Sequence, residues 1–241
     1  MRTGSGDPAR TLALLWRADE RAARPGPRPR LSIDDVVDAA TAAADEDGLE
    51  ALTMRALAER LGVSPMTLYT YVPGKAELLD LMLDALYLAM PRPALDAGWR
   101  ERLRAVAHAN RELFAAHPWA ARVSTARPPL GPGLMAKYEY ELSALDGLGL
   151  GDLEMDAALT FLLAFVQSHA VAALDAAGAG SDEEWWAAAG PVLARFVTAE
   201  QYPLASRVGT AAGEAQGGAY DADRAYAFGL ERVLDGLAVL I

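Results

Sequence analysis

The stretch TMRALAERLGVSPMTLYTYVPGK, residues 53–75, holds two short helical patterns on either side of a Gly-Val-Ser corner. Ser64 followed by Pro65 is a helix-start signal, because serine caps helix N-termini well and proline fits the first helical position. The turn sequence VPGK then stops the second helix after about eight residues, which is a length of roughly 12 Å. The pattern predicts two short helices held at a steep angle.

The second of these helices is too short and too polar to serve a core alone. A helix of this length is unstable in water unless neighbours hold it. Leu68 and Val72, with Val63 in the turn, can anchor one side, and the threonine and tyrosine side chains remain on the other. A DNA major groove is about 12 Å wide and admits one α-helix. The geometry indicates a helix-turn-helix that binds DNA.

Helices are also expected on both sides of this motif. SIDD reads as a capping box, with Ser32 as N-cap and Asp35 at the third helical position, and the apolar residues after it follow a helical period. This helix should stop at DEDG, 45–48. A strongly amphipathic helix opens at Lys75, stops at PRP, 91–93, and connects the two halves of the chain.

The remainder of the chain also shows helical patterns, and we find no alternation typical of strands. Further helices are expected near 8–23, 97–116, 118–125, 133–147, 152–176, 182–200 and 221–241. The Gly/Ala-rich stretch 203–220 is expected to be loose. The predicted fold class is all-α, with an N-terminal three-helix helix-turn-helix DNA-binding domain and a larger C-terminal helical domain.

Composition narrows the class of protein. The chain has 241 residues, no cysteine and a net charge of −11. The lack of cysteine removes disulfides and thiolate chemistry. Residues 1–30 hold seven arginines against three acidic residues, whereas 76–241 hold 12 basic against 22 acidic ones. A basic arm therefore precedes an acidic body, which still permits DNA binding through a local face.

Targeting signals are not expected in this sequence. The N-terminus lacks an apolar signal region, and no run of about 18 apolar residues predicts a membrane span. We therefore expect a cytoplasmic protein without a membrane partner. No H-E-x-x-H, G-x-S-x-G or phosphate-loop motif occurs, so an enzyme is not expected.

The sequence LTMRALAERLGVSPMTLYTYVPGKAELLDLML resembles the DNA-binding domain of the TetR family of one-component transcriptional repressors. The matching positions are Thr53, Leu57, Ala58, Gly62, Val63, Ser64, Leu68, Tyr69, Tyr71, Val72, Lys75 and Leu78. Three helices are expected before Lys75, as the family requires. More weakly, YAFGLERVLDGL, 226–237, is similar to the last helix of the tetracycline-repressor subgroup, and TARPPLGPGLMAKYEYELSAL sits where that subgroup has its middle helices.

The resemblance implies a ligand-responsive repressor that binds a palindromic operator, a double-stranded DNA site, as a homodimer. A small hydrophobic or aromatic effector would release it. The alternative is a helix-turn-helix regulator that acts as an activator or without a small-molecule effector. The implied domains are a basic arm, 1–30, the DNA-binding domain, 31–76, and an effector-binding and dimerisation domain, 77–241.

Site residues follow from the resemblance position by position. Arg55 is expected to reach a base edge or a phosphate, and Tyr69 and Lys75 to hold phosphates. The expected DNA-binding residues of the motif are Arg55, Ser64, Pro65, Met66, Thr67, Tyr69, Thr70, Tyr71 and Lys75. Four of them, Pro65, Met66, Thr70 and Tyr71, differ from the tetracycline repressor, so a tetracycline operator is not implied. Arg28 and Arg30 form a separate hypothesis, either minor-groove contacts or part of a solubilising tail.

Family logic places the dimer on the long apolar helices near 152–176 and 221–241, two from each subunit in a four-helix bundle. The alternative is that both helices are internal to a monomer. Candidate effector contacts are polar or aromatic residues on apolar faces: His108, Asn110, Phe114, Trp119, Phe161, Phe165, His169 and Trp185, with Gln167 and Trp186 beside them. For each of these residues, core packing or plain surface exposure is the alternative. The chain reads RVST where the tetracycline subgroup places a metal-assisting histidine, so neither a metal nor another cofactor is expected.

Overall fold

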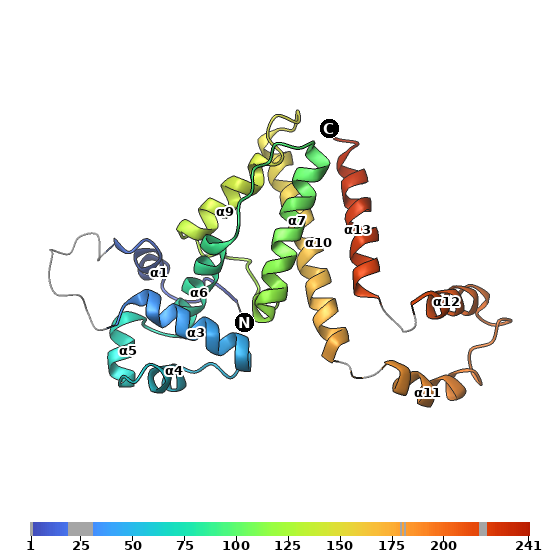
Figure 1. Ribbon diagram of the computed structural model, residues 1–241, viewed down its shortest axis with the longest axis horizontal. Helices are drawn as coiled ribbons and strands as arrows, with labels where there is room; N and C mark the ends of the chain where they lie inside the picture. The colour runs from blue at the N-terminus through green and yellow to red at the C-terminus, as the bar shows by residue number, and fades with distance from the viewer. Residues whose placement is uncertain (1, 19–30, 179, 181, 217–220) are drawn as a thin grey trace.

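The computed structural model describes residues 2–18, 31–178, 180, 182–216 and 221–241 (Figure 1). Within these residues the regular elements are helices, and an isolated bridge joins Arg2 to Ser124. The helices are α1 (Pro8–Leu15), α3 (Ile33–Asp47), α4 (Met54–Arg60), α5 (Pro65–Tyr71), α6 (Lys75–Ala89), α7 (Trp99–Ala116), α8 (Pro118–Ala121), α9 (Pro132–Ser143), α10 (Asp152–Gly178), α11 (Asp182–Leu193), α12 (Pro203–Gln216) and α13 (Ala222–Leu237). The predicted all-α fold is confirmed.

The N-terminal helices start where the sequence signals place them. The Ser32 hydroxyl accepts a hydrogen bond from the Asp35 amide at 3.1 Å, and the Asp35 carboxylate accepts one from the Ser32 amide at 2.8 Å. Thr53 caps α4 through the amide of Ala56, and Ser64 caps α5 in the same way. Each cap satisfies an amide that the first helical turn leaves without a partner.

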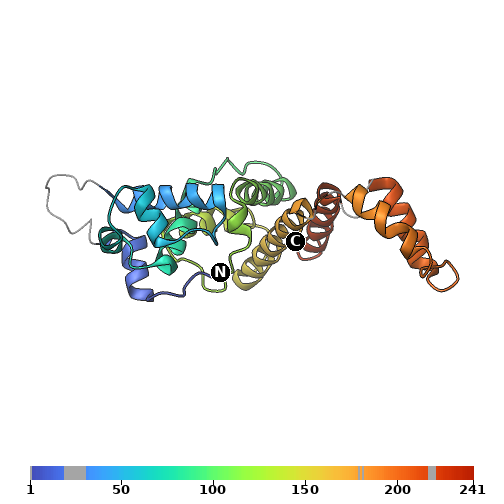
Figure 2. The same ribbon diagram turned by 90° about the horizontal axis from the view of Figure 1, so that it is seen from below.

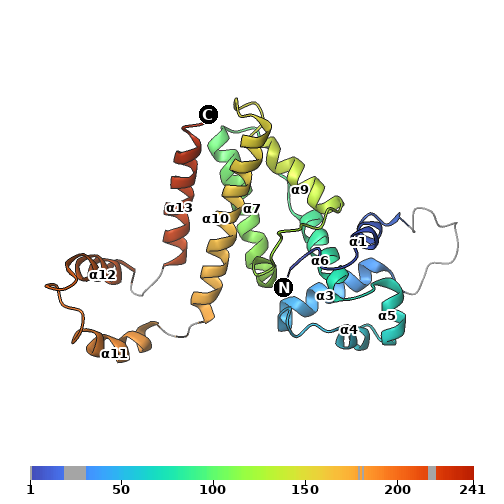
Figure 3. The same cartoon turned by 180° about the vertical axis from the view of Figure 1, so that it is seen from behind.

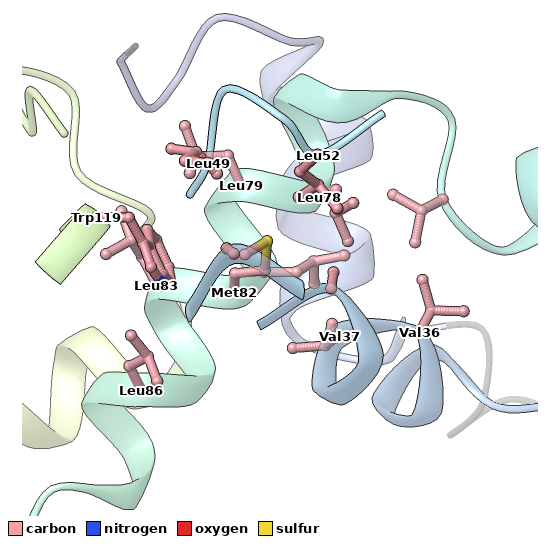
Figure 4. Packing of buried hydrophobic residues seen from close by; sticks show 14 of the residues in the cluster. Val36, Val37, Leu49, Leu52, Leu78, Leu79, Met82, Leu83, Leu86 and Trp119 are labelled. Atoms are coloured by element: carbon pink, nitrogen blue, oxygen red, sulfur yellow. The ribbon is translucent and has the colours of Figure 1, made fainter. Parts of the chain in front are cut away.

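Helix α6 lies at the centre of the first hydrophobic core (Figure 4). Leu78, Leu79 and Met82 of α6 are almost fully buried, with Val36 and Val37 of α3 on one side. Residues of the C-terminal half complete the same core, among them Leu113, Trp119 and Val123. The two halves of the chain are therefore packed together around α6.

A second hydrophobic core fills the C-terminal half. Helices α7, α10 and α13 lie side by side (Figures 1 and 3), and Leu103, Leu162 and Leu234 are buried between them. Helix α9 packs mainly on α6. A methyl group at Gly133 of α9 would lie 1.8 Å from the backbone oxygen of Asp84 in α6, so only glycine permits this approach. The Asp84 carboxylate accepts hydrogen bonds from the amides of Gly133 and Leu134 at 3.1 and 2.8 Å.

As far as residue 216, the structure corrects the expectation that residues 203–220 are loose, and residues 217–220 lie outside the described residues. Helix α12 occupies Pro203–Gln216, with proline at its first position. Its alanines favour a helix strongly enough to outweigh Gly209 and Gly213, each of which costs about 1 kcal/mol. Helices α11 and α12 extend away from the other helices (Figure 2), and we call this pair the C-terminal limb.

Several expected helices are shorter in the structure. Helix α1 ends at Leu15, because Arg17 adopts a left-handed backbone with φ of 50°. Residues 19–23 of the expected 8–23 helix lie outside the described residues. Helix α8 ends at Ala121 rather than at 125. Helix α11 ends at Leu193 rather than at 200, shortly after an internal Pro191, which cannot donate a backbone hydrogen bond.

Helix α10 is long and apolar enough to cross a membrane by length and composition alone, with a mean hydropathy of 1.8. The sequence nevertheless holds no unbroken run of about 18 apolar residues here, because Gln167, Ser168 and His169 interrupt the apolar stretch. Core helices of soluble proteins pass the same test. One face of α10 packs on α7 and α13, and the opposite face is exposed.

Candidate functional site

The corner between α4 and α5 is built by the backbone. Gly62 has a φ of 66°, a left-handed conformation that costs glycine little. Its amide donates to the Glu59 carbonyl at 3.0 Å, and the Val63 amide donates to the Ala58 carbonyl at 3.0 Å. These bonds turn the chain sharply and set α5 across α4, as the Gly-Val-Ser pattern predicted.

Helix α5 has one buried and one exposed face. Leu68 is fully buried, and Val72 just after the helix is buried with it. Met66 is 76% exposed and Tyr69 43% exposed. The remaining exposed residues of this face are Ser64, Pro65, Thr67 and Thr70, and Arg55 of α4 is exposed nearby in the sequence. The structure thus places most of the expected DNA-binding side chains where solvent, or a DNA groove, can reach them.

Two hydroxyl groups on this face already have partners. The Thr70 hydroxyl donates to the Thr67 carbonyl at 2.6 Å, so its oxygen and methyl group remain for an outside contact. The Thr67 hydroxyl lies 2.8 Å from that of Ser64, which caps the helix. The methyl groups of these threonines therefore suit contact with a thymine methyl better than direct hydrogen-bond donation to a base.

Tyr71 and Lys75 are placed differently from the other expected contacts. Tyr71 is half-buried and packs against the first core. The Lys75 ammonium donates to the backbone carbonyls of Leu49 and Leu52, at 2.9 and 2.5 Å. Burial lowers the pKa of Lys75. The lysine thus ties the α3–α4 connection to the start of α6, a role that the sequence reading missed. Arg28 and Arg30 lie outside the described residues.

In the C-terminal half, three of the candidate effector residues come together. His108 of α7, Phe165 and His169 of α10, and Tyr226 of α13 form a group that we call the aromatic cluster. Ring centroids lie 4.5 Å apart for Phe165 and His169, 5.7 Å for Phe165 and Tyr226, and 5.8 Å for His108 and Tyr226. The Arg111 guanidinium sits 4.3 Å from the centre of the Tyr226 ring. The cluster joins all three long helices of this half.

The electrostatics of the aromatic cluster favour neutral groups. Burial raises the pKa of Tyr226 to about 12, so its hydroxyl keeps its proton at neutral pH. Burial, followed by the charge of Arg111, lowers the pKa of His169 below its ordinary value of 6.5. Tyr226 is only 3% exposed, and its hydroxyl finds no hydrogen-bond partner among the described residues. A buried donor in this state is a feature that an incoming acceptor would satisfy.

The other candidate effector residues are spread over different environments. Asn110 is buried and donates to the Glu141 carboxylate at 2.6 Å, and Lys137 donates to the same carboxylate at 2.7 Å. Phe114 is half-buried between the two cores. Phe161 is exposed on α10, and Trp185 is exposed on the C-terminal limb beside Trp186. Gln167 bonds to the carbonyls of Ala121 and Val123.

Trp119 belongs to the junction between the halves. Its indole nitrogen donates to the Asp45 carboxylate of α3 at 2.8 Å, and the His117 ring nitrogen lies 2.9 Å from the same carboxylate. A cavity of about 590 Å³ opens beside Trp119, and it is lined by Asp45, Gly48 and Arg122 among others. Trp119 therefore connects the two halves instead of joining the aromatic cluster.

Two family descriptions match the chain. The bacterial regulatory proteins of the tetR family match residues 36–82, and the tetracyclin repressor-like C-terminal domain matches residues 92–241. The chain belongs to the TetR family. TetR-type relatives span nearly all of it: the HTH-type transcriptional repressor DrrR1 of Streptomyces coeruleorubidus is 41% identical, with 99% of this chain and 88% of that protein covered. The tetracycline repressor class A from transposon 1721 of Escherichia coli is 30% identical, over 87% and 91%.

Solved structures of TetR-family proteins have the same fold. ActR of Streptomyces coelicolor in complex with actinorhodin superposes with a TM-score of 0.73 at 29% identity, covering 88% of this chain and 97% of that one. Apo ActR gives a TM-score of 0.71 at 30% identity, over 87% and 96%. The chain is accordingly a TetR-family transcriptional repressor with a DNA-binding helix-turn-helix, and its relatives are transcription regulators, not enzymes.

Sequence reasoning did not select Tyr226, Arg111, Lys137 or Glu141 of this TetR-type C-terminal half. A signal existed for two of them, since Lys137 and Glu141 are spaced i, i+4 and both fall on a helical face that turns out to be buried. Tyr226 follows the spacing of Leu230 and Leu234, which reads as ordinary core. Its missing hydrogen-bond partner becomes visible only once α7, α10 and α13 are assembled.

Proposed function

We propose that the chain binds a palindromic operator as a homodimer and leaves it when a small aromatic effector binds to the C-terminal half. The observation that carries the proposal is the face of α5. Its buried side is anchored by Leu68 and Val72, while Met66, Thr67 and Thr70 stand exposed on a helix short enough to enter a major groove. Such a regulator would act in the cytoplasm, where its DNA lies.

The exposed face of α10 supports the homodimer. Leu153 is 86% exposed and Phe161 is 56% exposed, and Ala157 and Ala164 continue the same stripe at helical spacing. Phe228 adds an exposed aromatic ring on α13. A contiguous apolar surface of this kind on a monomer usually marks a contact with another protein. Two copies of α10 and α13 would form a four-helix interface and give the dimer two equivalent α5 helices.

The aromatic cluster supports an aromatic effector that carries a hydrogen-bond acceptor. Its rings offer faces for stacking, and the Tyr226 hydroxyl offers a donor without a partner among the described residues. The comparison with ActR supports the same class, because that protein has been solved with actinorhodin and with (S)-DNPA. A bound molecule here would contact α7, α10 and α13 at once.

Release would work by a shift between two populations. The effector must bind one spacing of the two α5 helices better than the other, by about 1–3 kcal/mol for a 5- to 150-fold effect on operator affinity. Helix α6 is the natural link, because it contributes to the core of the DNA-binding helices and packs on α9 of the effector half.

The deciding experiment measures binding to DNA from upstream of the chain's own gene by fluorescence anisotropy across a salt series. The test variant combines Arg55→Ala and Met66→Ala, two exposed residues of the motif. The matched control is Arg60→Ala, an arginine of the same helix that is paired with Glu46 instead. We expect tight wild-type binding confined to a palindrome, a loss of about 1–3 kcal/mol or more in the test variant, and near wild-type binding in the control.

An equal loss of operator affinity in the test variant and the Arg60→Ala control would mean that only the positive charge of this region matters. That result would count against base recognition by α5. The alternative function, a regulator without a small-molecule effector, predicts the same DNA binding. It differs in that a panel of planar aromatic compounds, actinorhodin included, would leave the operator complex unchanged.

A further inference from the structure

The sequence predicts a basic arm at 1–30, of which the structure describes residues 2–18, and these lie against the body of the protein. We call these residues the N-terminal strap. Figure 3 shows the strap passing across α6 to reach α1. Thr3 is only 2% exposed, its amide donates to the Ser124 carbonyl at 3.0 Å, and its hydroxyl donates to the Arg127 carbonyl at 2.6 Å. The strap thus begins on the connection between α8 and α9.

The middle of the strap is fitted to α6. The Gly4 amide donates to the Asp80 carboxylate at 3.0 Å, and Gly4 itself has a left-handed φ of 61°. A methyl group at Gly6 would lie 2.3 Å from the carboxylate of Glu77. Leu15 of α1 is 3% exposed and belongs to the first core. The strap is therefore fitted to α6 by a backbone hydrogen bond, by close packing at Gly6 and by burial of Leu15.

The end of the strap contacts both halves again. The Trp16 indole donates to the Leu130 carbonyl at 2.9 Å, on the connection that leads into α9. Arg17 forms an ion pair with Asp34 at the start of α3, which belongs to the DNA-binding helices. One continuous segment therefore bonds α3 and α6 on one side and the connection at 124–131 on the other.

We propose that the N-terminal strap is an intramolecular clamp that fixes the angle between the helix-turn-helix and the effector half. The surface formed by α6 and residues 124–131 is its binding site, and the occupant is the chain's own N-terminus. When the strap is released, the two halves sample a wider range of relative orientations. Its effect on operator affinity rests on the function proposed above, whereas its effect on orientation does not.

The test measures one distance inside the chain. Glu59→Cys on α4 and Asp146→Cys after α9 are both exposed positions, and the natural sequence has no cysteine to compete for label. Full-length chains labelled at both sites and diluted with unlabelled protein report the orientation by pulsed spin-label distance measurement, in a monomer or a dimer. The strap-release variant is Leu15→Ala with Trp16→Ala. The matched control is Leu12→Ala, an exposed leucine of the same helix.

We expect a narrow distance distribution in the wild type and in the control, and a shifted or clearly broader one in the strap-release variant. Hydrogen exchange at the Thr3 and Gly4 amides verifies the release, because both are hydrogen-bonded in the docked strap. An unchanged distribution despite lost protection overturns the proposal, and so does rapid exchange of both amides in the wild type. Loss of operator binding by every form, with the distance change present, refutes the proposed function and leaves the clamp intact.

Discussion

Lys75 illustrates how a single residue can support the site through contacts inside the protein, because its ammonium bonds to two backbone carbonyls. Replacing it by methionine keeps the apolar stem and removes the ammonium. The buried ends of the Leu49 and Leu52 carbonyls then lose their donor, so we expect Lys75→Met to lower the free energy of unfolding by about 1–3 kcal/mol. Chemical denaturation measures this, with the exposed Arg55→Ala as control at within about 0.5 kcal/mol of wild type. A Lys75→Met protein as stable as wild type would show that the bonds to Leu49 and Leu52 contribute nothing to folding.

A basic residue close to a recognition helix has the same sequence pattern whether it binds phosphate or a backbone carbonyl. Which of the two it binds depends on the position of distant backbone in the folded chain. Lys75 bonds to the carbonyl of Leu49, which lies 26 positions earlier in the sequence. For the same reason the sequence could nominate His108, Phe165 and His169 but could not show that Tyr226 completes their cluster. Residue types were predictable here, whereas their partners were not.

His169 gives the aromatic cluster a pH dependence of known sign. Because the pKa of His169 is lowered below 6.5 in the folded protein, the unfolded chain takes up its proton first as the pH falls. Stability should therefore decrease as the pH drops from 6.5 toward the lowered value, and it should gain nothing from this residue above 6.5. Among the groups that face His169 are Arg111, Phe165 and Tyr226.

The check compares thermal unfolding of wild type and His169→Gln at pH values from 8 down to about 5. The variant should show a smaller decrease across the acidic range, since glutamine does not titrate. Parallel curves for the two proteins would mean that His169 has the same pKa folded and unfolded.

At the scale of helices, the contact between α6 and α9 makes the sharpest prediction. Gly133→Ala places a methyl group 1.8 Å from the Asp84 backbone oxygen, and backbone cannot move aside as a flexible side chain can. We expect a loss of about 3 kcal/mol in the free energy of unfolding. Gly209→Ala in α12 is the control, because nothing lies within 4 Å of the added methyl group. A Gly133→Ala protein that unfolds like the control would contradict this packing.

Helix boundaries near strong local signals were predictable. The capping box at Ser32 and the Ser64–Pro65 start gave α3 and α5 their first residues, because these signals act within one helical turn. Helix α12 was not predicted, because its segment contains glycines and has no clear apolar stripe. The helix-favouring alanines outweigh those glycines in the structure. The docking of the N-terminal strap could not be predicted, since its partners Asp80, Ser124 and Leu130 are more than 70 positions away in the sequence.

For the whole molecule, the proposed dimer is tested on the exposed face of α10. Phe161→Glu puts a charge where each subunit would bury an aromatic ring, and twofold symmetry counts the loss twice. Burial of one such ring contributes about 1.5–3 kcal/mol, so the dimer dissociation constant should rise roughly 100-fold or more. Analytical ultracentrifugation measures it, with the exposed Met135→Glu of α9 as control. A dimer unaffected by Phe161→Glu would have to use another surface.

The sequence predicts a division of the chain into two halves, but it does not predict the hydrophobic core that they share. The predicted boundary lies at 76/77, between the motif and the effector half, yet the first core draws residues from both sides of it. The Trp119 indole donates a hydrogen bond to Asp45, and Leu15 packs in the same core as α6. The contacts therefore cross that boundary. Hydrophobic periodicity and turn signals predict single helices and loops. Only the folded structure shows which of these segments share a hydrophobic core.

Because Gly133 has no side chain, the backbones of α6 and α9 are in contact. The Asp84 carboxylate of α6 also accepts hydrogen bonds from two amides at the start of α9. We expect two helices joined in this way to move together as one rigid unit. A push on α9 from inside the effector half should then reach the DNA-binding helices almost undiminished. We therefore expect the bending between the two halves to occur at the connection 91–98, and a mutation that stiffens this connection should weaken the response without touching effector or operator.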